Sequence, residues 1–279
     1  MRRLMAMLAA GLLAVLVPAG TARADDISAA ARGVARVVVS AVVEGEVVDV
    51  EHGTGFAVAP GRIVTNAHVV ALVERYPGQT SIRIVPSEGA DAFDGTVVAL
   101  DAERDLALID VPGLRAPPLA LFGGPIGEGE AMVTLGYPGN VDLATARSID
   151  DFLTPQMPVR SEGVFSGARR IGATGVMVHT ATIARGNSGG PVLDRCGRVL
   201  GVNAALSRRD EADGSFAFAI AGPELAGFLR DARQPAAMVG SACVGMAEVL
   251  ARERPTPAAL DTPSDASGPT PRTRPIATR

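Results

Sequence analysis

Short apolar runs separated by glycine, proline and small polar residues fill most of the chain. Runs of this kind, rich in β-branched residues and bounded by turn residues, predict short β-strands. The segments assigned to strands are Val37–Val50 (a strand, or a hairpin around Glu44-Gly45-Glu46), Gly53–Val58, Ile63–Val64, Ser81–Val85, Gly95–Leu100, Leu106–Leu108, Met132–Leu135, Ser161–Phe165, Val176–Thr182, Val192–Leu193, Arg198–Asn203 and Phe216–Ile220. Many short strands with Gly and Pro turns predict an all-β fold, either a barrel or a sandwich.

The segments without strand patterning complete the outline. Ile27–Val34 and Pro223–Ala232 predict short helices on either side of the strands. Pro112–Gly127 is rich in Pro and Gly and is interpreted as a connector between two halves. Residues 141–160 lack clear periodicity, so we expect a surface loop of the kind that often lines a binding cleft.

The N-terminal segment has the pattern of a secretory signal peptide. Two arginines precede the apolar run Leu4–Val17, and Ala22-Arg23-Ala24 is a small-residue cleavage site. The apolar run is too short to span a membrane comfortably. We therefore expect residues 1–24 to be removed during general secretion and the protein to reach the periplasm or the medium without a stable membrane anchor.

The C-terminal segment changes character twice. Residues 233–251 are apolar and predict a helix. From Arg252 onward, prolines alternate with Thr, Ser, Ala and Arg. Such a composition cannot bury enough apolar area to offset its ordering entropy, so residues 252–279 are predicted to form a disordered tail.

Composition and charge narrow the class of protein. The chain has 279 residues, of which 47% are hydrophobic, enough for one large domain or two small ones. The formal net charge of −4 gives no indication of a nucleic-acid partner. All 26 basic residues are arginine, which excludes a Ser–Lys dyad, a Schiff-base lysine and a P-loop lysine.

The clearest chemical signal is Gly186-Asn187-Ser188-Gly189-Gly190-Pro191. Glycines allow a sharp turn with positive φ, which can aim the N–H groups of Gly186 and Ser188 at one point. Two such donors can stabilise the oxyanion of an acyl-transfer intermediate, with the Ser188 hydroxyl as nucleophile. A serine nucleophile also needs a base and an acid that orients the base.

Two further motifs offer these groups. Thr65-Asn66-Ala67-His68-Val69-Val70 offers His68 as the base, and Asp105-Leu106-Ala107-Leu108 offers Asp105 as the acid. Asp110 shares the strand parity of Leu106 and Leu108 and would face away from Asp105, which favours Asp105. Asp101, before a turn, is a weaker rival.

The three motifs, in the order His, Asp, Ser, resemble those of chymotrypsin-like (trypsin-fold) serine proteases, and most closely the bacterial HtrA/Deg branch. The resemblance covers roughly residues 35–230. It implies two six-stranded Greek-key barrels with the active site between them. We assign residues 25–122 to the first barrel and residues 123–232 to the second. HtrA proteins usually carry a PDZ domain after the protease, and we expect none here.

The resemblance also implies roles for individual residues. Ser188 would attack a peptide carbonyl with His68 as base and Asp105 as orienting acid, and no cofactor would be needed. Gly186, Asn187 and Ser188 would form the oxyanion hole. The substrate pocket would include Thr182, where trypsin has an acidic residue, together with Ile183, Asn203 and Ile220. A small, apolar pocket would favour cleavage after small or medium aliphatic residues of protein or peptide substrates.

Two other functions remain open at this point. The same fold could serve as a catalytically weak or inactive binding or chaperone-like protein. An esterase-type acyl hydrolase is a second alternative, because Gly186-Asn187-Ser188-Gly189-Gly190 fits G-x-S-x-G. That family has its histidine after the serine, and no His follows Ser188 here.

Cysteine and histidine usage bears on stability and metals. Cys196 and Cys243 are the only cysteines, and an exported protein could join them in a disulfide. His52, His68 and His179 show no metal-ligand spacing, so we expect no metal site. His52 could approach the cleft, although a surface turn is the expected position. His179 could touch substrate, although packing within a strand is the expected role.

Overall fold

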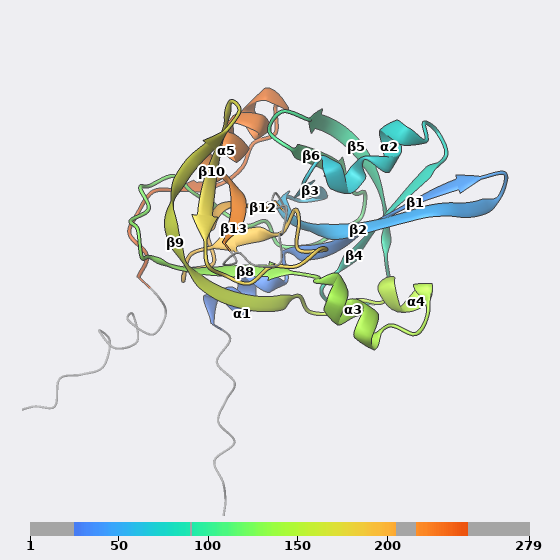
Figure 1. The fold of residues 1–279 in the computed structure, drawn as a ribbon, viewed down its shortest axis with the longest axis horizontal. Coiled ribbons are helices and arrows are strands. Elements are labelled where there is room, and N and C mark those ends of the chain that lie inside the picture. Colours follow the sequence, from blue (N-terminus) through green and yellow to red (C-terminus); the bar gives the residue numbers. More distant parts are fainter. Residues whose placement is uncertain (1–24, 90, 205–215, 245–279) are drawn as a thin grey trace, which may run out of the picture. The chain divides into compact units, whose positions relative to one another are not determined.

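The structure, a computed structural model, describes residues 25–89, 91–204 and 216–244. Strands predominate within these residues (Figure 1). The predicted signal peptide (residues 1–24) and the predicted tail (residues 252–279) lie outside the described residues. Within the described part of the chain, no helix has the length and apolarity needed to cross a membrane.

The N-terminal half forms a closed barrel of six strands in the order β1-β2-β3-β6-β5-β4. The strands are β1 (Val34–Val43), β2 (Glu46–Ala59), β3 (Arg62–Thr65), β4 (Thr80–Pro86), β5 (Phe93–Asp101) and β6 (Leu106–Asp110). Alternate residues such as Val37, Ile63 and Ile109 are completely buried and fill the barrel interior. This half carries the 3-10 helix η1 (His68–Val70) and the helix α2 (Leu72–Arg75) after β3.

A second set of six strands forms the other barrel. The strands are β8 (Ala131–Gly136), β9 (Val159–Ile171), β10 (Thr174–His179), β11 (Pro191–Leu193), β12 (Val199–Ala204) and β13 (Ala217–Ala221). They pair in the order β11-β8-β9-β10-β13-β12, and the additional pairing of β11 with β12 closes the ring. The short strand β7 (Leu121–Phe122) extends the sheet from β12. The predicted two-barrel, all-β fold is therefore confirmed.

One apolar cluster is shared by the two barrels. Val34 and Phe56 of the first barrel contact the same cluster as Leu135 and Val202 of the second. The helices α1 (Asp26–Ala31) and α5 (Gly222–Asp231) add to it with Ile27, Ala30, Leu225 and Phe228. Burial of apolar area across this surface contributes about 25 cal/mol per Å² and fixes the two barrels against each other.

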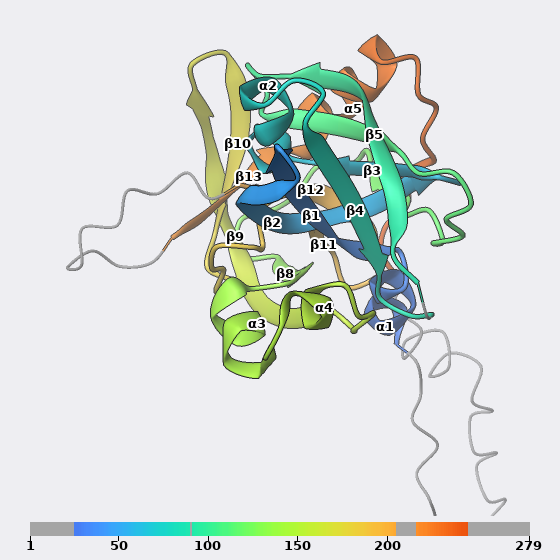
Figure 2. The same ribbon diagram turned by 90° about the vertical axis from the view of Figure 1, so that its right-hand side faces the viewer.

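Two segments differ from the prediction. Residues 141–160, expected as a loop, include the end of α3 (Gly139–Thr145) and all of α4 (Ile149–Phe152), side by side beyond the end of β8 (Figure 2). Helices this short show no amphipathic period over a useful length, so the pattern missed them. The helix expected over 233–251 is wrong for its described part, because Met238–Val239 forms strand β14 against β7. Residues 245–251 lie outside the described residues.

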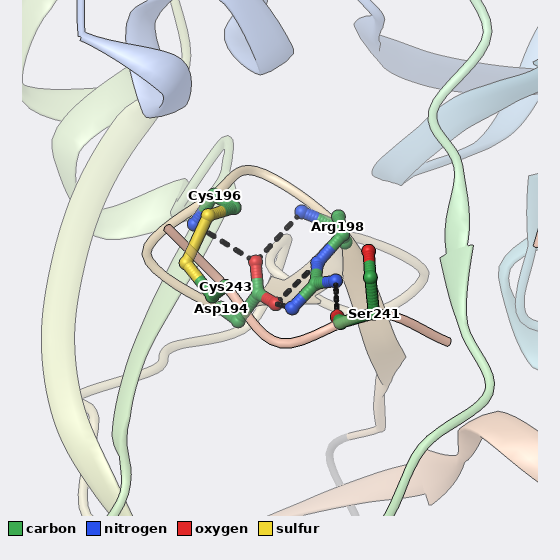
Figure 3. Close-up of a disulfide and its surroundings, with 5 residues drawn as sticks. All are labelled: Asp194, Cys196, Arg198, Ser241 and Cys243. Carbon is green, nitrogen blue, oxygen red and sulfur yellow. Dashed lines mark hydrogen bonds and ion pairs between the residues drawn. A yellow bond between two sulfur atoms is a disulfide. The ribbon is translucent and has the colours of Figure 1, made fainter. Parts of the chain in front are cut away.

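The predicted disulfide is present and anchors the segment after β14. Cys196 and Cys243 are joined with their Cα atoms 5.8 Å apart. Beside them, the carboxylate of Asp194 accepts hydrogen bonds from the Cys196 N–H and from the Nε of Arg198 (Figure 3). Arg198 also donates through Nη1 to Ser241 O at 2.5 Å. Pairing with β7 and these contacts outweigh the local helical propensity of residues 236–243.

Replacing both cysteines by serine should lower the free energy of unfolding by about 4 kcal/mol, the loop entropy for a separation of 47 residues. The measurement is urea unfolding of the oxidised protein and of the Cys196→Ser/Cys243→Ser variant at one pH. An unchanged unfolding midpoint would show that the bond adds nothing to stability.

Candidate active site

The predicted site residues lie where elements of both barrels end. His68 begins η1 directly after β3, and Asp105 precedes β6. Ser188 lies in residues 184–190, called here the Ser188 loop, which lead into β11 of the second barrel. The backbone N–H of Thr54 in β2 donates to Ser188 O at 2.9 Å, so the Ser188 loop touches the first barrel directly.

His68 and Asp105 form a closely held pair. The His68 ring nitrogen Nδ1 lies 2.8 Å from Asp105 Oδ2 and 3.0 Å from Oδ1. The backbone N–H of His68 also donates to Oδ1 at 3.0 Å. The side chain of His68 is 47% exposed and that of Asp105 is 21% exposed. A carboxylate at Nδ1 places the ring proton there and leaves Nε2 as the basic nitrogen.

Asp105 has an unusual backbone conformation. Its φ is +55°, in the left-handed region that few residues other than Gly, Asn and Asp adopt. The buried side chain of Asn66 donates through Nδ2 to Asp105 O at 2.8 Å and fixes this conformation. The rival acids are engaged elsewhere, since Asp101 bonds Arg104 and Asp110 pairs with Arg62.

The glycines of the Ser188 loop are required by its shape. Gly186 and Gly189 have φ values of +95° and +86°. A Cβ at Gly186 would lie 2.2 Å from Tyr137 O, and one at Gly189 would lie 2.1 Å from Thr54 O. Any side chain at either position would therefore force the loop away from both barrels.

The loop leaves two amide donors unused. The N–H of Asn187 donates to Ala184 O at 3.0 Å, and the Asn187 side-chain oxygen lies against Gly136. Among the described residues, the N–H groups of Gly186 and Ser188 donate to no protein acceptor. Of the three residues predicted for an oxyanion hole, Gly186 and Ser188 therefore keep a free backbone N–H, whereas the backbone N–H of Asn187 is already paired.

Thr54 links this loop to both barrels and was missed by the sequence reasoning. Its hydroxyl donates to Gly186 O at 2.6 Å and accepts from the Tyr137 N–H at 3.0 Å. Thr54 O accepts from the hydroxyl of Thr65 at 2.7 Å. A buried threonine with all of these groups paired fixes the position of the loop. Its place in Gly53-Thr54-Gly55 is a weak signal in the sequence alone.

The residues predicted for the substrate pocket do not share one surface. Thr182 is exposed and Ile183 is half-buried, both just before the Ser188 loop. Asn203 is completely buried and pairs across strands with Ala219. Ile220, one position further along β13, faces the opposite side of the sheet and packs in the cluster shared by the barrels. Asn203 and Ile220 therefore do not line one common surface.

Asn203 instead partners a buried histidine. His179 Nε2 lies 3.2 Å from Asn203 Oδ1, and both residues are completely buried. Burial lowers the pKa of His179 to about 4. His179 therefore stays neutral at pH 7 and acts as a packed strand residue, as expected.

His52 was expected at a surface turn, but it lies close to the Ser188 loop. It is half-buried in β2, and a Cβ at Gly186 would lie 2.8 Å from its Nε2. The ring also contacts Phe152, with the ring centroids 5.6 Å apart. Burial lowers the pKa of His52. Its neighbour Gly139 donates its N–H to Arg185 O at 2.7 Å, another contact that the sequence did not indicate.

One group of metal-ligand residue types gathers within the described ranges. The ligand atoms of Asp194, Cys196 and Cys243 lie within 4.8 Å of one another. The two sulfur atoms are joined in the disulfide and cannot bind a metal as thiolates, and the carboxylate is paired with Arg198. This group therefore does not suit a metal ion.

Comparison with known proteins places these features in context. The sequence matches the family described as "Trypsin-like peptidase domain" over residues 53–202. It is 34% identical over 178 residues to the serine protease Rv3671c of Mycobacterium tuberculosis, covering 63% of this chain and 41% of that protein. It is 30% identical over 162 residues to human serine protease HTRA3, covering 57% and 34%. The chain thus spans less than half the length of these relatives.

Solved structures give the same likeness. The crystal structure of the active form of the Rv3671c protease has a TM-score of 0.57 with 28% sequence identity, covering 78% of this chain and 88% of that one. The inactive form has a TM-score of 0.55, with 27% identity, covering 74% and 91%. The two-barrel architecture of this chain is therefore shared with the Rv3671c protease.

The buried His179 should make the protein less stable in mild acid. The folded pKa of about 4 lies below the ordinary value of 6.5, so the unfolded chain binds more protons between these pH values. The free energy of unfolding should therefore fall by about 3 kcal/mol as pH drops from 6.5 to 4. His179→Gln, which keeps a partner for Asn203, should remove this part of the dependence. Urea unfolding of both proteins across this range measures the difference; identical pH profiles would contradict it.

Proposed function

The chain belongs to the trypsin-like peptidase domain family, and on this premise we propose that it is an exported serine endopeptidase. Ser188 would be the nucleophile, His68 the general base and Asp105 the residue that orients the base. The observation that carries the proposal is the pairing of His68 with Asp105 beside a loop whose Gly186 and Ser188 amides have no protein acceptor among the described residues.

In the proposed reaction, His68 Nε2 takes the hydroxyl proton as Ser188 Oγ attacks the peptide carbonyl carbon. The carbonyl oxygen gains the negative charge and accepts hydrogen bonds from the Gly186 and Ser188 amides. Collapse of this intermediate breaks the C–N bond, and the imidazolium gives its proton to the leaving amine. Water, deprotonated by His68, then attacks the acyl-enzyme and regenerates Ser188.

Asp105 supports this cycle through charge and orientation. Its carboxylate holds the Nδ1 proton and stabilises the imidazolium that forms at each transfer. Asp105 also accepts a hydrogen bond from the backbone N–H of His68. The same carboxylate therefore holds both the ring and the backbone of His68. Removal of the charge should leave this geometry in place and weaken only the base.

The substrates we propose are proteins or peptides reached after export. Thr182 carries no charge that could pair with Lys or Arg, and Ile183 supplies apolar surface beside it. These two residues support cleavage after small or medium aliphatic side chains. The signal-peptide pattern of residues 1–24 supports export to the periplasm or the medium.

Ser188→Ala should lower kcat for hydrolysis of unfolded casein by at least ~10³-fold, because nucleophile, base and acid act as a unit. Asp105→Asn should lower kcat to a similar extent. Asp110→Asn, at the far end of β6, is the control and should keep the kcat of the wild type. Mapping of a fluorophosphonate label to Ser188 gives an independent check. A purified Ser188→Ala protein with most of its activity would exclude the mechanism, and an inactive wild type would favour a binding protein on the same fold.

Cleavage should follow Ala, Val or Leu in preference to Lys or Arg. An unpaired buried cation costs several kcal/mol, so kcat/KM for Val before the scissile bond should exceed that for Arg at least ~10-fold. The measurement is a peptide-library digest read by mass spectrometry. A preference for Arg would overturn the pocket assignment and leave the catalytic residues in place.

A further inference from the structure

Arg36 is a buried arginine in the middle of an apolar strand. Its side chain is only 2% exposed, although it lies in β1 among valines. An arginine is rarely buried unless its guanidinium is paired. It lies on the face of β1 opposite the barrel interior, which is filled by Ala35, Val37 and Val39.

The partners of Arg36 all come from the segment that follows β8. Its Nη2 donates to Asp142 Oδ1 at 3.1 Å, and its Nη1 donates to Phe152 O at 2.8 Å. The guanidinium lies over the ring of Tyr137 at 4.6 Å and that of Phe152 at 5.7 Å. One side chain of the first barrel therefore holds both α3 and α4 of the second half.

The start of α3 in turn contacts the Ser188 loop. Gly139, the first residue of α3, donates its N–H to Arg185 O at 2.7 Å. In a trans peptide, the C=O and the following N–H point in opposite directions. A carbonyl of Arg185 held toward Gly139 therefore turns the N–H of Gly186 away from α3, where it can serve as a donor for the oxyanion.

The alternative arrangement of this peptide is accessible to the chain. Gly186 has no side chain, and rotation of the Arg185–Gly186 peptide meets little steric resistance at a glycine. Such a rotation would replace the Gly186 N–H by the Arg185 carbonyl oxygen at the point where the oxyanion forms. A carbonyl oxygen there would repel the developing negative charge instead of stabilising it.

We propose that Arg36 is a positioning residue for the oxyanion hole, acting through α3 and the bond from Gly139 to Arg185; this inference rests on the proposed function. Asp142 links Arg36 to the start of α3. Its carboxylate pairs with Arg36, and it lies three residues after Gly139 in the same helix. The titratable groups near it among the described residues include His52, with Nε2 4.0 Å from Asp142 Oδ2, and Tyr137 under the guanidinium. Asp151 lines the same pocket as Arg36 and Asp142.

The chain offers a matched control in Arg198. This arginine is also buried, pairs with Asp194 at 2.6 Å, and lies 4.3 Å over the ring of Phe122 (Figure 3 shows the pair with Asp194). It also donates to a backbone carbonyl, Ser241 O. Its interactions are of the same kinds as those of Arg36, but its partners lie beside the disulfide and not beside Gly139.

The test compares Arg36→Met with Arg198→Met in the full exported protein. At a temperature where both variants are folded, Arg36→Met should lower kcat on a peptide ester at least ~10-fold with KM nearly unchanged, since one oxyanion donor contributes ~10²–10³-fold. The shape of its pH–rate profile should match that of the wild type. Arg198→Met should lose comparable thermal stability and keep its kcat within ~2-fold of wild type.

Hydrogen exchange gives a readout that needs no activity. Peptides covering 139–145 and 184–189 should exchange at least ~10-fold faster in Arg36→Met and remain unchanged in Arg198→Met. If Arg36→Met does not fold, Asp142→Asn replaces it in both measurements. Equal losses of kcat in the two arginine variants, or unchanged exchange at 184–189, would overturn the proposal. An inactive wild type with the expected exchange pattern would reject the proposed function alone.

Discussion

The Ser188 loop of the second barrel is held by hydrogen bonds to a single threonine of the first barrel, Thr54. Thr54 uses its N–H, its hydroxyl and its carbonyl at once, toward Ser188, Gly186, Tyr137 and Thr65. Because Thr54 is completely buried, each of these groups would be costly to leave unpaired. The distance between His68 on one barrel and Ser188 on the other therefore depends on a set of short hydrogen bonds as well as on apolar packing.

These contacts distribute the site over elements that fold from distant parts of the sequence. The apolar cluster shared by the barrels sets their coarse arrangement, and burial of this kind is not directional. Hydrogen bonds and ion pairs supply the direction. Thr54 fixes the carbonyl of Gly186, Gly139 fixes that of Arg185, and Asn66 fixes that of Asp105. Each contact holds one peptide plane beside a residue proposed to take part in the reaction.

The sequence was most informative where chemistry depends on neighbouring residues. The motifs around His68, Asp105 and Ser188 are each short and contiguous in the sequence, and strand parity favoured Asp105 over Asp110. Parity also separates Ile220 from Asn203, since a shift of one residue moves a side chain to the other face of a sheet. The contacts of Arg36 with Asp142 join positions 106 residues apart, and no local pattern can show them. Its one signal was a charge inside an apolar run.

The left-handed conformation of Asp105 restricts this position in two independent ways. The proposed chemistry requires a carboxylate, while a φ of +55° is adopted most readily by Gly, Asn and Asp, although Glu44 and Arg233 also adopt a positive φ in this chain. Glutamate keeps the charge and loses the backbone preference, and glycine or asparagine keeps the backbone preference and loses the charge. Aspartate combines a carboxylate with a preference for this backbone region, so a single substitution at position 105 gives up the charge or the backbone preference.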